Sequence, residues 1–496
     1  MYRSIKMRKT INLKTLANAC NDGLVFKLLT KQYDLNKLKE IEKEDLVKLV
    51  NLLNLESKKV SYLDGYYVNY IIKQINKEFD LLKYTEEGIL NIELKSVFKE
   101  EKVLAQQKKN HQYLKAITNK IDIITYISGD NKLYKYNNVE EKLQEISSKE
   151  LIEIMSKYRT LINLHLDEIF QPSKYLISPF NDTKKFIDSK YILTQHQQEI
   201  VEDVVNLKNN HIIEGRAGTG KSLVLYDIGK RLVDNGLKVT FIHCGQLNDG
   251  HNRLRDERKW DIVPIKNALE DIVFANEDAI LVDEVQRMYP QQLRGIVEGC
   301  KENNVKIIFS IDKRQYLDVK ERDYNNFEAI QKIAADVKYH KLTEKIRSNK
   351  EIASFIKELF DKEKRNDIPY KNIDVEYLNK DCDFKEYVEY LENTNWKYIP
   401  FTVPLYGDTT FLKYSCLNQE LNSHRVIGQE FENVVVVLDE NFELINNSLK
   451  YVGEPCCYDP LQMLFQNVTR TRTKLKFIIV ENKSLYSNLL KIITKA

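Results

Sequence analysis

The sequence predicts an α/β protein in which two parallel-sheet lobes follow a small α/β domain with a helical N-terminus. Two observations predict this fold class. From Leu193 onward, apolar strand-like segments alternate with helical segments, which is typical of parallel sheets flanked by helices. Between residues 62 and 136, short β-branched and aromatic runs surround one helical stretch, which is typical of a compact α/β domain. With 496 residues, the chain is long enough for about three domains.

Changes in pattern along the chain place the expected boundaries. Residues 171–190 are polar and contain proline, so we expect them to end a connector rather than to build a core. The expected segments are a helical segment plus small α/β domain over 1–140, a helical connector over 141–190, a first lobe over 191–337 and a second lobe over 338–496.

Composition and charge are those of an ordinary globular protein, with 43% hydrophobic and 30% charged residues. The 76 Lys and Arg are nearly balanced by 73 Asp and Glu, so any basic surface for nucleic acid is local. The seven cysteines show no metal-binding spacing and are expected as reduced thiols. Neither a signal peptide nor a membrane span is indicated, so we expect a cytoplasmic protein without a membrane partner.

The first candidate site lies in the small domain. Residues 1–60 are rich in lysine and show helical spacing, and two strand-like runs then flank the turn-like Glu86-Glu87-Gly88. If these runs form a hairpin, Asp80 lies beside Glu93 and Lys95, which share one strand face. Two carboxylates can hold Mg²⁺ for phosphodiester attack, and a neighbouring lysine can counter the charge that develops on the phosphate.

This arrangement resembles the PD-(D/E)xK nucleases, over roughly residues 60–137. The resemblance implies a restriction-endonuclease-like fold, with Asp80 and Glu93 as Mg²⁺ ligands and Lys95 as a catalytic partner. The helix that follows offers Gln106, Asn110 and Tyr113 at helical spacing, similar to the glutamine and tyrosine of RecB-like members, and we count Gln106 among the catalytic candidates. A degenerate nuclease fold that only grips nucleic acid is the alternative.

A phosphate-binding loop follows the connector. The strand end Ile212-Ile213 runs into Gly215-x-x-x-x-Gly220-Lys221-Ser222, and a helical pattern follows. Strand, glycine-rich turn and helix are the context of a P-loop, in which backbone N–H groups surround a polyphosphate. The prediction is an ATP site in which Lys221 reaches the β- and γ-phosphates and Ser222 ligates Mg²⁺. The glycines expected to cradle the phosphates are Gly215, Gly218 and Gly220.

Polar residues follow the later strands of the first lobe. Ala279–Arg287 is an apolar strand that ends in Asp283 and Glu284, which we expect to hold Mg²⁺ and to orient or deprotonate the attacking water, respectively. Gln315 follows the next strand and is expected to sense the γ-phosphate. Gln197, near the start of the lobe, is able to contact adenine through its amide.

These segments resemble the superfamily 1 helicases, and three motifs in the second lobe extend the resemblance to about residues 190–485. It implies that two RecA-like lobes sandwich ATP, that Arg347 in LTEKIRSN and Arg470 in NVTRTRTKL reach the phosphates, and that Glu430 in SHRVIGQEF contacts the nucleotide sugar. The short spacing between motifs is most similar to the helicase domain of Schlafen proteins. Whether such a compact enzyme separates duplexes or only translocates stays open.

The sequence thus predicts an ATP-dependent nucleic-acid translocase or helicase coupled to a Mg²⁺-dependent nuclease. We expect ATP and Mg²⁺ as cofactors and DNA rather than RNA as the partner, in defence or repair. Whether the protein forms a homo-oligomer or acts with an accessory protein stays open. The alternatives are a nucleic-acid-stimulated ATPase switch with a degenerate nuclease domain, and an RNA-directed nuclease–ATPase.

Overall fold

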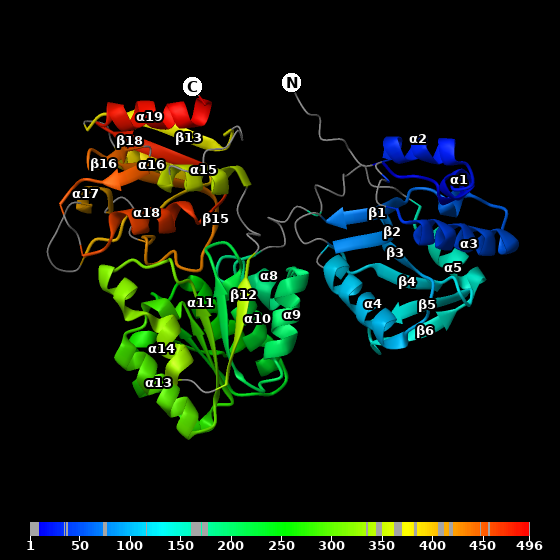
Figure 1. The fold of residues 1–496 in the computed structure, drawn as a ribbon, viewed down its shortest axis with the longest axis horizontal. Helices are drawn as coiled ribbons and strands as arrows, with labels where there is room; N and C mark the ends of the chain where they lie inside the picture. Colours follow the sequence, from blue (N-terminus) through cyan, green and yellow to red (C-terminus); the bar gives the residue numbers. More distant parts are fainter. Residues whose placement is uncertain are drawn as a thin grey trace. The chain divides into compact units, whose positions relative to one another are not determined.

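The computed structural model divides into two compact units, residues 1–175 with 189–195, and residues 176–188 with 196–496 (Figure 1). Each unit is described by itself. The structure describes residues 9–33, 35, 38–72, 77–115, 117–159, 170, 177–333, 336–343, 350–361, 370–380, 384–404, 411–415, 420–446, 448–454 and 457–495.

The first unit contains a six-stranded sheet whose spatial order follows the chain, from β1 to β6. All neighbouring strands are antiparallel except β3 and β4, which are parallel and joined by α4. The strands are β1 (Tyr67–Ile72), β2 (Lys77–Thr85), β3 (Gly88–Lys95), β4 (Ile121–Ile127), β5 (Lys132–Asn137) and β6 (Lys142–Ile146). The helices are α1 (Leu13–Ala19), α2 (Gly23–Tyr33), α3 (Glu40–Glu56), α4 (Glu100–Lys115) and α5 (Ser148–Lys157), with a 3₁₀ turn at Ser61–Leu63.

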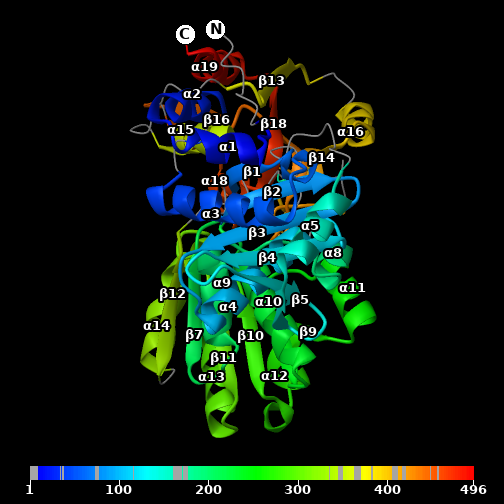
Figure 2. The ribbon, with the colours of Figure 1, turned by 90° about the vertical axis from the view of Figure 1, so that its right-hand side faces the viewer.

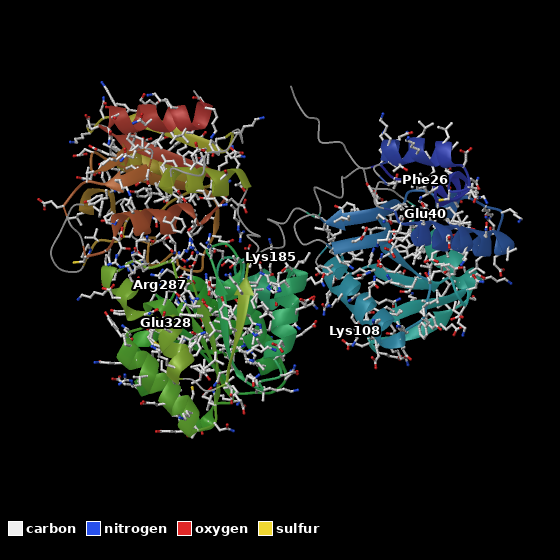
Figure 3. All side chains as sticks on the ribbon, viewed as in Figure 1. Phe26, Glu40, Lys108, Lys185, Arg287 and Glu328 are labelled. Carbon is white, nitrogen blue, oxygen red and sulfur yellow. The ribbon has the colours of Figure 1, made fainter. Side chains whose placement is uncertain are left out.

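Apolar side chains on the two faces of this sheet form two cores. One face packs against α1, α3 and α5, and the other packs against α4. At the surface, Lys108 of α4, labelled in Figure 3, forms an ion pair with Glu141 (2.6 Å) beside β6. The sequence assigns residues 141–157 to a helical connector, but the structure differs. β6 pairs with β5, and Leu151 and Met155 of α5 are fully buried in the first core.

The second unit begins with a six-stranded, fully parallel sheet in the order β12-β7-β11-β10-β8-β9. Figure 2 shows β12, β7, β11 and β10 side by side. Helix α10 covers one face, and α13 and α14 cover the other. The strands are β7 (Asn210–Gly215), β8 (Val239–His243), β9 (Asp261–Pro264), β10 (Ala279–Asp283), β11 (Lys306–Ile311) and β12 (Val337–Leu342). The helices are α8 (Thr183–Ile187), α9 (Gln195–Val204), α10 (Lys221–Asp234), α11 (Asp249–Arg258), α12 (Ala268–Asp271), α13 (Pro290–Glu302) and α14 (Asn326–Ile333).

A second parallel sheet, in the order β13-β18-β15-β14, forms the other lobe of this unit. Helices α15, α18 and α19 pack on one core of this lobe and α16 on another, and a small antiparallel hairpin, β16–β17, is attached. The strands are β13 (Ile373–Leu378), β14 (Trp396–Tyr398), β15 (Phe431–Leu438), β16 (Phe442–Ile445), β17 (Ser448–Tyr451) and β18 (Thr471–Val480). The helices are α15 (Lys350–Phe360), α16 (Phe384–Asn393), α17 (Leu412–Ser415), α18 (Pro460–Val468) and α19 (Lys483–Thr494).

The expected α/β architecture with parallel sheets is therefore confirmed. One boundary differs from the expected one: the sequence opens the second lobe at residue 338, but β12 pairs with β7, so the first sheet extends to Leu342. Among the described residues, none of the helices has the length and apolar character needed to cross a membrane.

Candidate functional site

The glycine-rich loop lies between β7 and α10, which begins at Lys221. Gly218 and Gly220 have φ angles of +77° and +85°, in the left-handed region that glycine tolerates best. A Cβ on Gly215 would lie 2.4 Å from Thr219 Oγ1, so a larger residue would push the loop apart. These three glycines give the loop the curvature with which backbone N–H groups surround an anion.

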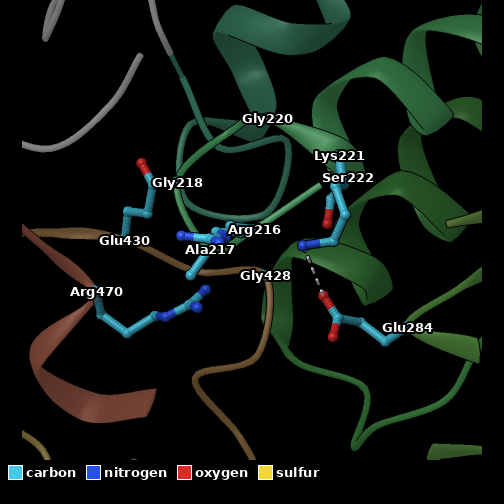
Figure 4. Close-up of a pocket in the computed structure, with 10 residues that line it drawn as sticks. All are labelled: Arg216, Ala217, Gly218, Gly220, Lys221, Ser222, Glu284, Gly428, Glu430 and Arg470. Atoms are coloured by element: carbon cyan, nitrogen blue, oxygen red, sulfur yellow. Dashed lines mark ion pairs between the residues drawn. The ribbon is translucent and has the colours of Figure 1, made fainter. Parts of the chain in front are cut away.

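A polar pocket lies beside this loop, and both lobes line it (Figure 4). The second lobe contributes Glu430 and Arg470, so the pocket unites residues far apart in the sequence. The first lobe contributes Arg216, Ala217, Gly218, Gly220, Lys221, Ser222 and Glu284, and the second lobe also contributes Gly428. A pocket with three basic side chains and a helix N-terminus fits a polyphosphate.

Lys221 lies between two carboxylates of the first lobe. Its Nζ is 3.9 Å from Glu284 Oε1, drawn as a dashed line in Figure 4, and 3.8 Å from Asp312 Oδ2. All three side chains are buried, and an isolated buried ammonium is costly unless carboxylates surround it. The carboxylates thereby hold the Lys221 ammonium beside the loop.

Asp283 and Glu284 occupy the end of β10, as the sequence predicts. Asp283 accepts a hydrogen bond from the Ser310 hydroxyl, and its buried Oδ2 lies 3.8 Å from His243 Nδ1 without a hydrogen bond to any described residue. Desolvation acts to raise the pKa of Asp283, but His243, Ser310 and Lys221 outweigh it, so the net pKa lies below the ordinary value. A buried, ionised carboxylate, one residue before Glu284, fits a hard cation such as Mg²⁺.

Glu284 has an unusual backbone, with φ +62° and ψ +41°. This left-handed conformation costs a residue other than glycine about 1–3 kcal/mol. Its carboxylate accepts a hydrogen bond from Gln286 Nε2 (2.5 Å), and its N–H donates to Ser310 Oγ (3.1 Å). The surrounding contacts therefore fix the direction of the carboxylate.

The two candidate glutamines do not line the pocket. Gln197 of α9 donates to the backbone carbonyl of Thr219 in the loop (3.0 Å) and is buried. Gln315 contacts Gln466 of α18, so it joins the first lobe to the second. Gln197 supports the phosphate-binding loop, and its expected contact with adenine stays a prediction.

Two of the second-lobe candidates, Glu430 and Arg470, line the pocket. Arg470 is 7% exposed and donates to the carbonyls of Gln429 (3.3 Å) and Gln466 (3.3 Å). Glu430 forms an ion pair with Arg472 (3.2 Å). Arg347 falls outside the described residues.

Sequence reasoning assigned no role to three charged residues around this site. Arg472 orients Glu430, and Asp312 pairs with Lys221. Arg287 is buried, its guanidinium lies 3.7 Å from Glu284, and its nitrogens have no hydrogen-bond partner within the described structure. Its place in Asp283-Glu284-x-x-Arg287, shortly after the carboxylate pair, is the signal by which the sequence could have identified it.

Residues 177–188, which we name the bridging segment, contact both lobes. Toward the second lobe, Ser178 Oγ donates to the Gly428 carbonyl (2.8 Å) and Asn181 Oδ1 accepts from the Glu430 N–H (2.7 Å). Toward the first lobe, the Phe180 ring stacks on His251 of α11, with centroids 4.0 Å apart. The segment therefore spans the lobes next to the pocket residue Glu430.

In the first unit, the hairpin of β2 and β3 brings the predicted nuclease residues together. Asp80 Oδ2 accepts a hydrogen bond from the Leu94 N–H (2.8 Å), between Glu93 and Lys95. Burial, followed by the nearby Glu93, raises the pKa of Asp80 to about 8, although Lys95 acts to lower it. Asp80, Glu93 and Lys95 thus form one electrostatic cluster.

Amide side chains surround the Glu93 carboxylate. It accepts hydrogen bonds from Asn91 (3.0 Å), from Asn110 of α4 (2.9 Å) and from the candidate Gln106 of the same helix. Tyr113 instead donates to the Leu193 carbonyl (3.2 Å).

Sequence reasoning missed Lys77, the first residue of β2. Burial lowers the pKa of its ammonium, whereas Glu93 and Asp80 act to raise it, so a second lysine lies near the two carboxylates. Lys77 belongs to no motif, and only the folded hairpin reveals it.

One family model spans the P-loop. Residues 192–373 match the family model of an AAA domain. Among solved structures, the Pif1 helicase from Candida albicans is 14% identical, with a TM-score of 0.35, and the match covers 61% of this chain and 98% of that one. Pif1 helicase from Bacteroides in complex with ADP-AlF3 and ssDNA is 13% identical, with a TM-score of 0.33 and coverages of 60% and 94%. No curated protein matches the chain. The AAA-domain match supports ATP use and ATPase activity at the P-loop.

Proposed function

We propose that the second unit is an ATP-driven nucleic-acid translocase or helicase of the superfamily 1 type. The observation that carries this proposal is the pocket in which Arg470 and Glu430 of one lobe face the phosphate-binding loop of the other. In such an arrangement, hydrolysis changes how tightly the lobes are held together, which is the basis of stepwise movement. The compact spacing of motifs, similar to the Schlafen-type domain, favours translocation over extensive duplex separation.

Hydrolysis at this pocket uses the residues in distinct roles. Lys221 and Arg470 stabilise the charge on the transferred phosphoryl group, and Glu284 orients the attacking water and accepts its proton. Ser222 and Asp283 are the residues that would hold Mg²⁺, which supplies charge neutralisation to the phosphates when bound.

The partner that we propose is a DNA strand, in a process of defence or repair. The segment Ser423–Phe431, which resembles the strand-contacting motif of superfamily 1 helicases, supports a nucleic-acid partner.

We further propose that the first unit is a Mg²⁺-dependent nuclease coupled to this motor. Asp80 and Glu93 would hold the cation, and the raised pKa of Asp80 supports the fit, because a cation between the carboxylates relieves their repulsion. Water adds to phosphorus and gives up a proton to solvent, the phosphodiester P–O bond breaks, and the leaving oxygen takes a proton from solvent. Lys95 stabilises the negative charge of the pentacoordinate phosphate.

One observation favours a second candidate, an ATPase switch with a degenerate nuclease domain. Three amide side chains donate to the Glu93 carboxylate, so its oxygens have partners without a metal. In that case the hydrogen-bond network only stabilises the fold, and the cluster contacts nucleic acid without cutting it.

The deciding experiment measures cleavage of labelled single-stranded DNA, duplex DNA and RNA with Mg²⁺ or Mn²⁺, with and without ATP. Wild type, Lys95→Ala, Lys221→Ala and the exposed control Lys99→Ala are compared. Cleavage that is lost in Lys95→Ala and kept in Lys99→Ala supports the nuclease, and the preferred polymer separates DNA from RNA. Nucleic-acid-stimulated ATPase activity without cleavage of any substrate supports the switch.

A further inference from the structure

A cluster of metal-ligating side chains lies in the first lobe, apart from the pocket residues. It comprises Asp203 of α9, His211 of β7 and His340 of β12, and one ligand atom from each lies within 4.8 Å of the other two. His211 Nδ1 is 3.0 Å from His340 Nε2, which is 3.5 Å from Asp203 Oδ2. Two nitrogens and one oxygen therefore converge on one point.

The pairing of two distant strands creates this cluster. β12 lies parallel to β7, with Lys338 opposite His211 and His340 opposite Ile213, so the two histidines lie close on neighbouring strands. Their rings are stacked, with centroids 5.2 Å apart and planes at 22°. His211 is 1% exposed and His340 is half-buried, so the fold fixes both rings.

The facing ring nitrogens need a partner between them. Two imidazole lone pairs at 3.0 Å repel each other unless a proton or a metal ion lies between them. His211 Nε2, buried on the far side of the ring, has no hydrogen-bond partner among the residues that the structure describes, so no second contact there fixes the tautomer.

We propose that Asp203, His211 and His340 bind a divalent transition-metal ion of the zinc class. Two imidazole nitrogens and a carboxylate oxygen are ligands that suit Zn²⁺, and a water completes a four-coordinate site. Mg²⁺ is a poor match, because it prefers an all-oxygen octahedron.

The position of the site indicates a structural role. His211 lies four residues before Gly215 on β7, which is about 13 Å of extended strand. The ion would tie α9, which carries Gln197, to the strand that carries the phosphate-binding loop and to β12. This inference does not depend on the proposed motor or nuclease activity.

Lys338 competes with the metal ion. Its ammonium lies 2.7 Å from Asp203 Oδ2, and its side chain is 49% exposed, so it is able to turn into solvent. Binding of the ion requires that Lys338 leave Asp203. Lys338→Gln removes the competing charge, and we therefore expect it to tighten metal binding about fivefold, the scale of an exposed ion pair.

The test uses the full chain, freed of metal with a chelator and without nucleotide. Zn²⁺ binding is measured by calorimetry and by the shift in thermal unfolding, and Co²⁺ absorption reports nitrogen and oxygen ligands as opposed to cysteine thiolates. We expect Zn²⁺ to bind and to raise the unfolding temperature. Asp203→Asn and His340→Gln should weaken binding at least about tenfold, whereas the exposed neighbour His196→Gln should bind like wild type.

Two results would overturn the proposal. One is Zn²⁺ binding that is equal in wild type, Asp203→Asn and His340→Gln, which places the ion elsewhere. The other is unchanged or weaker binding in Lys338→Gln, because a site at Asp203 must gain when the lysine is removed. Misfolding cannot imitate this gain, so the proposal is testable even if His340→Gln is unstable.

Discussion

Replacing Asp80 by Asn should stabilise the metal-free protein while abolishing the proposed nuclease activity. The carboxyl of Asp80 is buried and lies near Glu93, and these two effects raise its pKa from 3.8 to about 8. Asparagine keeps an oxygen that can accept the hydrogen bond from the Leu94 N–H, but it carries no charge. The substitution therefore removes the electrostatic cost and retains the hairpin contact.

The size and pH dependence of this stabilisation follow from the pKa of Asp80 in the unfolded chain, 3.8, and in the folded protein, about 8. Because the folded protein binds the Asp80 proton more tightly than the unfolded chain, wild-type stability falls between pH 4 and pH 8, and above pH 8 the cost from this group is complete and no longer changes with pH. Each pH unit in that range corresponds to about 1.4 kcal/mol. At pH 7, about three units above the ordinary pKa, Asp80→Asn should stabilise the protein by at most about 4 kcal/mol. At pH 4 the gain should vanish.

Urea unfolding of wild type and Asp80→Asn at pH 5, 7 and 8, with and without Mg²⁺, measures this difference. Circular dichroism follows the whole chain and the fluorescence of Trp260 and Trp396 follows the second unit, so the transition that only circular dichroism detects belongs to the first unit. Glu78→Gln on the same strand is the control. Mg²⁺ should stabilise wild type but not Asp80→Asn. A stability difference that is the same at pH 5 and pH 8 would show that burial of Asp80 is not costly and would refute the reasoning.

Three further predictions concern the second unit. Lys221→Ala should abolish ATPase activity and weaken nucleotide binding, as measured by the ATP-induced shift in unfolding temperature; an unchanged turnover would contradict the role of the loop. Arg470→Ala should lower the kcat of ATP hydrolysis about 10³-fold or more with little change in nucleotide affinity. A change in affinity alone would show that Arg470 binds the nucleotide and does not act in catalysis. Gly428→Ala should destabilise the unit by about 1–3 kcal/mol in urea unfolding, because φ of Gly428 is +75° and a Cβ would lie 2.4 Å from the Phe180 ring. If the variant is as stable as wild type, the Phe180 ring moves aside at no cost.

Local chemistry was predictable from the sequence. The P-loop is a contiguous pattern, and two of its glycines, Gly218 and Gly220, have the positive φ angles that glycine tolerates best. The hairpin at Asp80 and Glu93 was also predictable, because a short turn and alternating strands fix the register within a few residues.

Features that depend on tertiary pairing were not predictable. β6 (Lys142–Ile146) is short and largely polar, so it shows no strand signal until β5 pairs with it. β12 (Val337–Leu342) is a polar edge strand, and nothing in its residues says which sheet it joins. His211 and His340 are 129 residues apart and meet only because these strands are neighbours.

The bridging segment links the affinity for ATP to mechanical tension on the chain. Residues 177–188 contact α11 of the first lobe and Gly428 and Glu430 of the second, so a change in the angle between the lobes must strain or break some of these contacts. If ATP binding changes the free energy of these contacts, tension on the segment changes the free energy of ATP binding by the same amount, because coupling between two sites is reciprocal. A load on the chain at this point would therefore register as a change in ATP dissociation constant.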